Sequence, residues 1–476
     1  MRISEYFNLG LEQPSLDFVD VQIDTDTPLF IDPTALCLLD TEWGARARAL
    51  IQDYFSLVLN LIKTGQHAEA QRLLSQLNEP NESRLGYSSD KPRGHGMGKQ
   101  LARKMWEELK ESSAVSSGII QDLEDTALMI DGIASDVISD IVTNIIREPL
   151  LEYTAEMCKE YGIPTQRVGS GPVWNTVDNK WETKFVEQPV VNGKRLLLVP
   201  KALVRQFITY QADQYYNLYL LERIQEEHVA QGLVRILKNG EQRPPTKKSL
   251  KEELKGAGKE QNRIQTVGRE EVLQKYREDK QNEPREPLSH EQIAEATGTA
   301  EPDWDGMLTR LDALPAGKIH AKQYEELVKE LFYALFYPWL MHPVSQERIH
   351  DGKKIIDITF WNMAEDDFFA WLRNNYVAPF VIVECKNYSE DPVNPEVDQL
   401  AGRFSPRRGK FGILVSRKIS NRQRFDERCR NTADDDRGYI IGIDDDDIKQ
   451  LIEAVRFGEK GKRLDILKTH FKKLVM

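Results

Sequence analysis

Several features that would place this chain in a common class are missing from its 476 residues. No run of 18 apolar residues occurs, and the first residues, MRISEYFNLG, lack the apolar core of a signal peptide. The four cysteines lie far apart without zinc-ligand spacing, and the eight histidines form no metal-binding pair. We therefore expect a cytoplasmic protein with reduced thiols and no membrane partner.

A nucleotide-binding loop is also missing. The glycine-rich stretch 93–106, RGHGMGKQLARKMW, resembles one, but Arg93 stands where the first glycine is needed. Gln100 likewise replaces the hydroxyl that would bind Mg²⁺. This spacing argues against a nucleoside triphosphatase, and a phosphate contact by a basic loop is the remaining alternative.

Charge is unevenly distributed along the chain. It contains 64 basic and 76 acidic residues, a net charge of −12, but from Asp305 onward the two signs are balanced at 28 each. The earlier residues therefore carry the whole net charge. An acidic segment is a poor general binder of nucleic acid and a better candidate for contacts with a partner protein.

This composition predicts three segments. Residues 1–237 are expected to form an α-rich, acidic domain with a few short strands, including a hairpin at Asn192-Gly193. Residues 238–304 are polar and are expected to form a partly helical connector, with a helical arm as the alternative. Residues 305–476 are expected to form an α/β domain.

The most informative motif lies in that last segment, where KKIIDITF is followed by PFVIVECKNY. Both read as buried strands, and because side chains alternate along a strand, Glu384 and Lys386 should share one face. Asp357 lies in the first strand. Two carboxylates and an ammonium at buried strand ends are costly unless they pair with each other or with a metal.

Hard divalent cations take oxygen ligands, usually one or two carboxylates with water and substrate phosphate. Asp357 and Glu384 would supply the carboxylates, with the Cys385 carbonyl as a third oxygen. Lys386 would orient the attacking water and stabilise the transition state. Glu-x-Lys alone is weak evidence, because it occurs five times in the chain. A structural salt bridge is the alternative, but only Glu384 ends a buried-strand pattern.

Five segments together resemble the PD-(D/E)xK nuclease superfamily, most closely its Mrr-like restriction endonuclease branch. They are QYEELVKELF, RIHDGKKIIDITFWN, FVIVECKNY, DQLAGRF and KFGILVSR, within roughly residues 318–450. The resemblance implies a restriction-endonuclease-like domain, a mixed sheet with element order αβββαβ, and DNA as the usual substrate. The chain departs from the family in having Ile356 where the motif name has proline, and a long segment before Glu384, expected to hold an inserted helix.

The family's catalytic positions map onto five residues of this chain. Asp357 matches the metal-binding aspartate, and Glu384 and Lys386 match the Glu-x-Lys pair. Glu325, which follows Tyr324, matches the glutamate of the first helix, and Gln399 matches a glutamine on the helix after the motif. Glu326 is expected to be exposed.

Basic residues follow this site. The window 403–430 contains ten Arg or Lys and only two acids, and fixed cations beside a phosphodiester cleft supply affinity for nucleic acid. Arg403, Arg407, Arg408 and Lys410 are therefore candidate DNA contacts, with a solvated charged surface as the alternative.

We expect an endonuclease that uses Mg²⁺ or Mn²⁺ to hydrolyse double-stranded DNA. The resemblance implies a role in bacterial restriction or anti-phage defence. One metal cluster cuts one strand, so double-strand cleavage predicts a homodimer or a higher homo-oligomer. An RNA nuclease, a structure-specific repair nuclease and an inactive nuclease fold used for binding remain alternatives.

Overall fold

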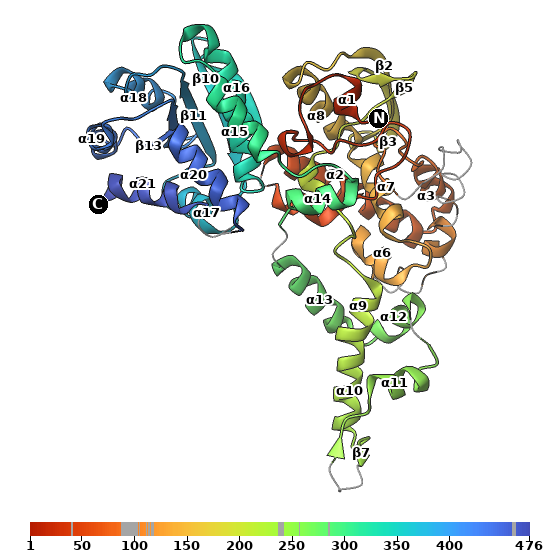
Figure 1. Ribbon diagram of the computed structural model, residues 1–476. Helices are drawn as coiled ribbons and strands as arrows, with labels where there is room; N and C mark the ends of the chain where they lie inside the picture. Colours follow the sequence, from red (N-terminus) through yellow and green to blue (C-terminus); the bar gives the residue numbers. More distant parts are fainter. Residues whose placement is uncertain are drawn as a thin grey trace. The chain divides into compact units, whose positions relative to one another are not determined.

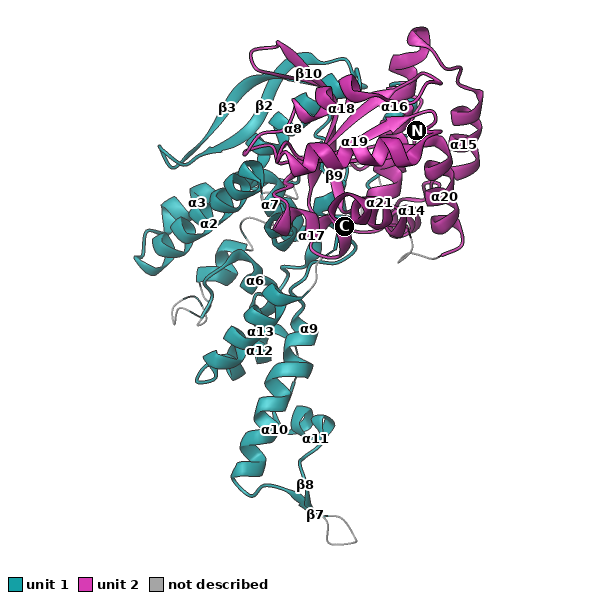
Figure 2. Ribbon diagram, turned by 90° about the vertical axis from the view of Figure 1, so that its left-hand side faces the viewer, with its two compact units in different colours: residues 1–7, 21–287 teal, residues 8–20, 288–476 magenta. Residues whose placement is uncertain are grey.

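The computed structural model describes residues 1–39, 41–86, 103, 105–110, 112, 115, 119–236, 242–256, 258–283, 286–458 and 463–476. The glycine-rich residues 93–102 lie outside these ranges, so the loop considered above is not described. The chain forms two compact units (Figure 2). Unit 1 contains residues 1–7 and 21–287, and unit 2 contains residues 8–20 and 288–476.

Unit 2 is built on a five-stranded mixed sheet in the order β13-β12-β11-β10-β9 (Figure 1). Neighbouring strands from β9 to β11 are antiparallel, and those from β11 to β13 are parallel. The strands are β9 (Leu340–Ile349), β10 (Lys354–Asn362), β11 (Phe380–Lys386), β12 (Phe411–Ser416) and β13 (Tyr439–Asp444). The central strands are almost wholly buried, which explains their continuous apolar runs.

Eight helices of unit 2 are described, and α16 to α21 pack against the sheet. They are α14 (His290–Thr297), α15 (Trp304–Ala313), α16 (Ala321–Phe336), α17 (Asp367–Asn375), α18 (Asn394–Ala401), α19 (Arg422–Asp434), α20 (Asp445–Arg456) and α21 (Asp465–Val475). Helix α16 packs against β9, β10 and β11 with the apolar stripe that its periodicity predicts. Helix α17 is the insertion expected before Glu384. The C-terminal part is thus mixed α/β, as predicted.

A short N-terminal segment belongs to unit 2 rather than to the domain around it in sequence. Residues 8–20 contain the 3₁₀ turn η1 (Gln13–Ser15), which packs on α16. Leu16 and Phe18 are fully buried. The Asp17 carboxylate accepts hydrogen bonds from the Tyr333 hydroxyl at 2.7 Å and from the His342 backbone N–H at 3.1 Å.

Unit 1 is mostly helical, as predicted. Its α-helices are α1 (Ile3–Tyr6), α2 (Glu42–Lys63), α3 (His67–Leu74), α6 (Leu123–Met129), α7 (Ser135–Ile145), α8 (Arg147–Glu160), α9 (Ala212–Tyr215), α10 (Leu221–Ala230), α11 (Lys247–Glu253), α12 (Lys259–Thr266) and α13 (Glu270–Asn282). Shorter helical turns are η2 (Pro33–Leu38), η3 (Lys201–Leu203) and η4 (Tyr216–Leu220).

Its strands form four two-stranded sheets, β1-β6, β2-β3, β4-β5 and β7-β8. They are β1 (Phe30–Ile31), β2 (Gln166–Asn175), β3 (Lys180–Gln188), β4 (Val190–Val191), β5 (Lys194–Arg195), β6 (Val204–Arg205), β7 (Arg235–Ile236) and β8 (Gln242–Arg243). The turn between β4 and β5 is the Asn192-Gly193 hairpin that the sequence predicts, with positive φ at both residues.

The boundary between the units, after Pro287, falls inside the polar stretch 238–304 that was expected to be a connector. Its first half forms α11, α12 and α13 of unit 1, which bury Leu250, Val272, Leu273 and Tyr276 but leave Ile264 exposed. A buried ion pair of 2.5 Å between Arg277 and Asp125 joins α13 to α6. Its second half contributes α14 and the start of α15 to unit 2.

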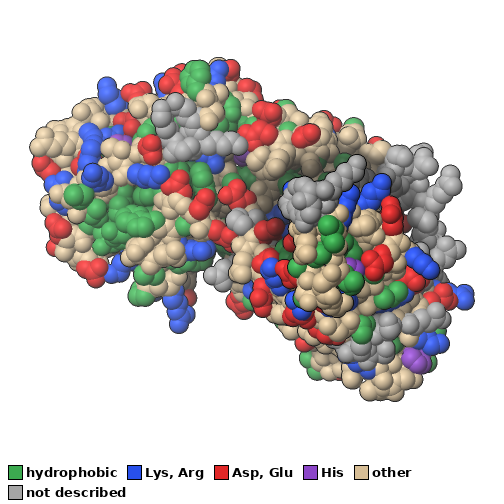
Figure 3. Space-filling view, turned by 90° about the horizontal axis from the view of Figure 1, so that it is seen from below, with side chains coloured by type: hydrophobic (Ala, Val, Ile, Leu, Met, Phe, Trp, Pro, Cys, Tyr) green, Lys and Arg blue, Asp and Glu red, His purple; other side chains and the backbone are tan. Residues whose placement is uncertain are grey.

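Among the helices of the described ranges, none combines the length and apolar character needed to cross a membrane. Hydrophobic side chains do gather on the surface of unit 2 at α17 and α21 (Figure 3). There Phe368, Trp371, Phe471, Val475 and Met476 line a groove of about 480 Å³.

Candidate active site

Asp357 and Glu384 lie just beyond the end of one strand pairing. The antiparallel ladder of β10 and β11 ends at the pair Ile358 and Val383, and Asp357 and Glu384 are the next residues on the two strands. Opposed residues of such a pair point to the same face of the sheet. The Asp357 carboxylate also accepts a hydrogen bond of 2.9 Å from the Cys385 backbone N–H. The two carboxylates are therefore neighbours on one face, as the motif predicts.

Lys386 and Gln399 complete a closed polar triangle with Glu384. The Lys386 Nζ donates to Glu384 Oε1 at 2.8 Å and to Gln399 Oε1 at 3.1 Å. The Gln399 amide in turn donates to the same Glu384 Oε1. Gln399 comes from α18 and the other two from β11, so packing of this helix at the strand end orients the lysine. Lys386 remains 14% exposed, whereas the side chain of Glu384 is only 1% exposed.

The site contains more negative charge than its cations balance. Burial raises the pKa of Glu384, and the nearby Asp357 charge raises it further, although Lys386 and Arg403 oppose the shift. Burial likewise raises the pKa of Asp357 against the same two cations and the Cys385 N–H. Glu384 Oε2 is buried without a hydrogen-bond partner in the described part of the chain. A buried carboxylate oxygen without a partner fits a cation ligand.

A divalent ion at this position would be held by few protein groups. Across the described residues, no three side chains of His, Cys, Asp or Glu are grouped to hold a metal ion. The ligands available are Asp357, Glu384 and the Cys385 carbonyl, with water and substrate completing the shell. Such a partial protein shell is usual for Mg²⁺, which keeps several waters.

Glu325 lies on α16, near the two carboxylates but outside their hydrogen-bond network. Its carboxylate accepts a 2.6 Å hydrogen bond from the Gln346 amide. Burial raises the pKa of Glu325 to about 7, and the negative charges of Asp357 and Glu384 add to the shift. The neighbouring Glu326 is exposed, with Lys322 at 3.7 Å. Of the two glutamates, the structure therefore directs Glu325 toward the site.

An interaction that sequence reasoning missed holds the helix that carries Glu325. The Tyr324 hydroxyl donates to Asp445 at 2.8 Å, and Arg417 pairs with the same carboxylate at 3.0 Å. The Arg417 guanidinium also lies over the Tyr324 ring, 5.1 Å from its centroid. The amino-acid sequence gives little indication of this cluster, because its members come from three separate segments: α16, α20 and the residue after β12.

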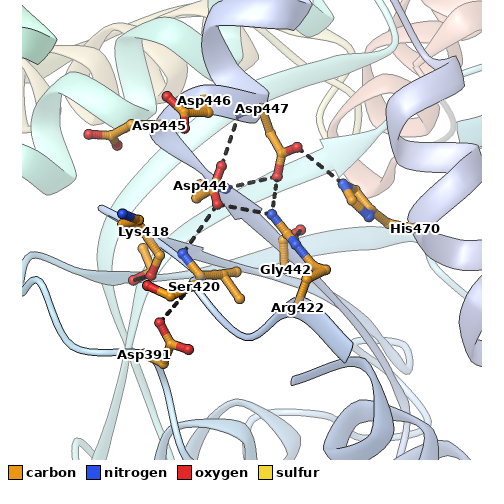
Figure 4. A network of polar contacts seen from close by, with 12 residues as sticks. Asp391, Lys418, Ser420, Arg422, Gly442, Asp444, Asp445, Asp446, Asp447 and His470 are labelled. Carbon is orange, nitrogen blue, oxygen red and sulfur yellow. Dashed lines mark hydrogen bonds and ion pairs between the residues drawn. The ribbon is translucent and has the colours of Figure 1, made fainter. Parts of the chain in front are cut away.

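In the run of four aspartates 444–447, the carboxylates of Asp444 and Asp447 are bound by protein groups. Arg422 binds Asp444 and Asp447 at 3.1 and 2.6 Å, and His470 lies 3.3 Å from Asp447 (Figure 4). Asp444 and Asp447 also form a capping box at the start of α20. Burial opposes ionisation of Asp447, but the His470 hydrogen bond and the Arg422 charge together lower its pKa.

The four candidate DNA contacts differ in their surroundings. Arg403 acts electrostatically on both Asp357 and Glu384, and its Nε is buried without a partner among the described residues. Arg408 donates to the Arg403 carbonyl at 3.0 Å. Arg407 is exposed, and Lys410 pairs with Asp436 at 2.7 Å. Only Arg403 is thus linked to the carboxylates, and the charge of Lys410 is already partly balanced.

Comparison with known proteins gives one match. A family described only as a domain of unknown function, DUF8370, matches residues 8–211, which lie mainly in unit 1 and end before the candidate active site. No curated protein matches the chain. No solved structure matches it either.

Proposed function

We propose that unit 2 is a PD-(D/E)xK nuclease that hydrolyses phosphodiester bonds of DNA with Mg²⁺ or Mn²⁺. The observation that supports this proposal is the grouping of Asp357, Glu384 and Lys386 on one face of β10 and β11. A purely structural ion pair would leave no reason for the second carboxylate, nor for the buried oxygen of Glu384 that lacks a partner. The element order, αβββαβ from α16 to β12 with α17 inserted, is the order expected of this superfamily.

The side chains have separable roles in this reaction. Asp357, Glu384 and the Cys385 carbonyl would hold the metal, which when bound lowers the pKa of the attacking water and offsets charge on the phosphate. Lys386 places a cation beside the scissile phosphate, and its hydrogen bonds to Glu384 and Gln399 fix the position of Nζ. Arg403 adds a second cation that attracts the phosphate backbone.

The biological part of the proposal is a role in bacterial restriction or anti-phage defence, and it rests on the family resemblance. Each chain carries one such site, so cutting both strands of a duplex requires two copies acting together. We accordingly propose a homodimer or a higher homo-oligomer as the active form.

The test incubates the purified chain with plasmid, branched DNA and RNA in Mg²⁺, beside Glu384→Ala and Lys386→Ala. Each variant should lose at least about 100-fold in cutting rate. Glu278→Ala is the matched control, because Glu278 also begins a Glu-x-Lys but is exposed on α13. Equal products from wild type and the two site variants would refute the proposal. Products from RNA alone would change the substrate, and products from branched DNA alone would favour repair.

A further inference from the structure

Unit 1 contains a cavity of about 830 Å³ that is separate from the proposed nuclease chemistry. Its wall comes from residues 78–84, the start of α8, strand β2 and the β4-β5 hairpin. The volume lies within the range of ligand pockets for small molecules, about 300–1,000 Å³. The cavity lies within the segment that matches the family of unknown function.

Cations outnumber carboxylates on the cavity wall. The cationic residues are Arg84, Arg147, Lys194 and Arg195, and the carboxylates are Glu79 and Glu82. This excess contrasts with the acidic composition of the N-terminal half of the chain. A concave surface lined by an excess of one sign raises the local concentration of the opposite charge. The wall therefore favours an anionic ligand.

One carboxylate holds two of these guanidinium groups in place. Arg147 is 3% exposed and pairs with Glu82, while its second terminal nitrogen donates to Asn144 Oδ1 at 3.1 Å. Arg195 lies 3.7 Å from the same Glu82 oxygen. Burial alone would raise the pKa of Glu82, but the Arg147 charge and hydrogen bond outweigh it and lower the pKa. Glu82 is thus ionised, and its charge is shared between two cations.

Arg84 is the decisive residue. Its side chain is 3% exposed, yet it makes no hydrogen bond or ion pair with the described residues, and its Nε is buried. Its charge acts on Asp26 from a distance, without preventing burial from raising the pKa of that acid. Arginine stays protonated in proteins, so burial cannot be relieved by loss of the proton. Such a buried cation needs a counter-ion from elsewhere.

The wall shows further signs of a built site. Arg147 Nε and Asn81 Oδ1 are also buried without partners in the described residues. Gly171 has φ of +75°, and a Cβ there would lie 3.3 Å from Arg147 Nη1, so the glycine leaves room for the guanidinium. These features place a donor and an acceptor at the cavity before any ligand arrives, which lowers the cost of binding.

We propose that this cavity binds a phosphate-bearing small molecule of about nucleotide size. The planar guanidinium groups of Arg84 and Arg147 match the geometry of phosphate oxygens, and Lys194 adds an exposed point charge at the rim. The unpaired Asn81 carbonyl oxygen would accept from a hydroxyl or amino group of the same ligand. The site is independent of the proposed nuclease chemistry.

Calorimetry and thermal unfolding of the full chain with inorganic pyrophosphate and with ATP test this proposal. Ionic strength is held constant with NaCl, so that general screening is the same in every sample. Wild type should bind at least one of the two saturably and unfold at a higher temperature in its presence. Arg84→Gln and Lys194→Gln should each weaken binding by about tenfold or more.

Lys180→Gln is the matched control, because Lys180 is an exposed lysine of β3 that pairs with Asp178 and does not line the cavity. It should bind as wild type does. Lys194→Gln tests the same cavity at an exposed position, without changing a buried side chain. The proposal fails if neither probe binds wild type at about 10 mM. It also fails if the cavity variants bind as tightly as the control.

Discussion

Replacing Glu384 by glutamine should stabilise the metal-free protein while removing its response to metal. Glu384 is 1% exposed, and its pKa is raised despite the contact with Lys386. A carboxyl whose pKa is higher in the folded than in the unfolded state contributes stability at low pH, and this contribution is lost as the pH rises through the folded-state value. At a pH above that value, the ionised carboxylate therefore opposes folding.

The size of the effect follows from the contacts that the amide would keep. Its carbonyl oxygen can still accept from Lys386 and Gln399, as Glu384 Oε1 does. What is removed is the charge and the oxygen that has no partner. The cost of a buried polar atom without a partner is about 1–3 kcal/mol, so we expect a gain of about 1 kcal/mol in the free energy of unfolding of Glu384→Gln.

Magnesium should reverse this order. A ligand that binds only the folded state stabilises it by RT ln(1 + [L]/Kd), which is about 1.4 kcal/mol at ten times Kd. Wild type should gain this amount, and Glu384→Gln should gain much less because one carboxylate ligand is lost. The variant is thus the more stable protein in EDTA, and wild type gains on it when Mg²⁺ is added.

Urea unfolding at pH 8 in EDTA and in Mg²⁺, followed by fluorescence, measures all four free energies. Glu326→Gln makes the same change on an exposed helix position and should shift stability by less than about 0.5 kcal/mol in both buffers. The reasoning is refuted if Glu384→Gln is less stable than wild type without metal. It is also refuted if both proteins gain equally from Mg²⁺.

Three further changes test the fold of unit 2. Tyr333→Phe removes the hydroxyl that donates to Asp17. The free energy of unfolding measured in urea should decrease by about 1–2 kcal/mol. An unchanged unfolding midpoint would argue against docking of residues 8–20. Burial raises the pKa of Asp445 to about 6. The stability of the wild-type protein should therefore decrease as the pH rises from about 4 to 6. Asp445→Asn should reduce this decrease in a series of unfolding measurements at different pH. Gly438 has φ of +121°, and a methyl group there would overlap the Phe404 ring. Gly438→Ala should therefore lower the free energy of unfolding by about 2–4 kcal/mol in the same assay. An unchanged free energy of unfolding would contradict the close packing.

The part of the candidate active site that the sequence can indicate is the part whose pattern is local. Glu384 and Lys386 are two residues apart on one strand, and strand alternation places them on one face. Asp357 lies on the adjacent antiparallel strand, next to the pair Ile358 and Val383, so a short-range pairing is enough to bring it near Glu384. The position of Gln399 depends on how α18 packs, which strand periodicity alone does not predict.

The segment 8–20 could not be assigned from sequence. It precedes a long helical domain, and its apolar residues Leu16 and Phe18 read equally well as the start of that domain. Its place in unit 2 depends on the Asp17 contacts with Tyr333 and His342, more than 300 positions later. The polar stretch 242–283 was hard to read for another reason. Its helices bury only a few side chains each, so composition resembled a connector.

The cavity of unit 1 was beyond sequence reasoning because its residues come from separate segments. Arg84, Arg147 and Arg195 are each more than 45 positions apart, and none lies in a recognisable motif. Their excess of positive charge is hidden within an acidic half of the chain. Net charge over a long segment therefore says little about a single concave surface, where burial decides which charges matter.

The two candidate sites share one physical property, a buried charge that the described residues do not fully neutralise. Glu384 keeps a buried oxygen without a partner in unit 2, and Arg84 keeps a buried Nε without one in unit 1, in both cases among the described residues. Stability alone gives no reason to retain either residue, because a neutral side chain of similar size avoids the cost of desolvation. An external counter-charge removes that cost, a divalent cation in one case and a phosphate group in the other. Neutralising either residue should therefore stabilise the ligand-free protein and remove the stabilisation by its ligand. If the charge were buried only for structure, neutralising it would instead destabilise the ligand-free protein.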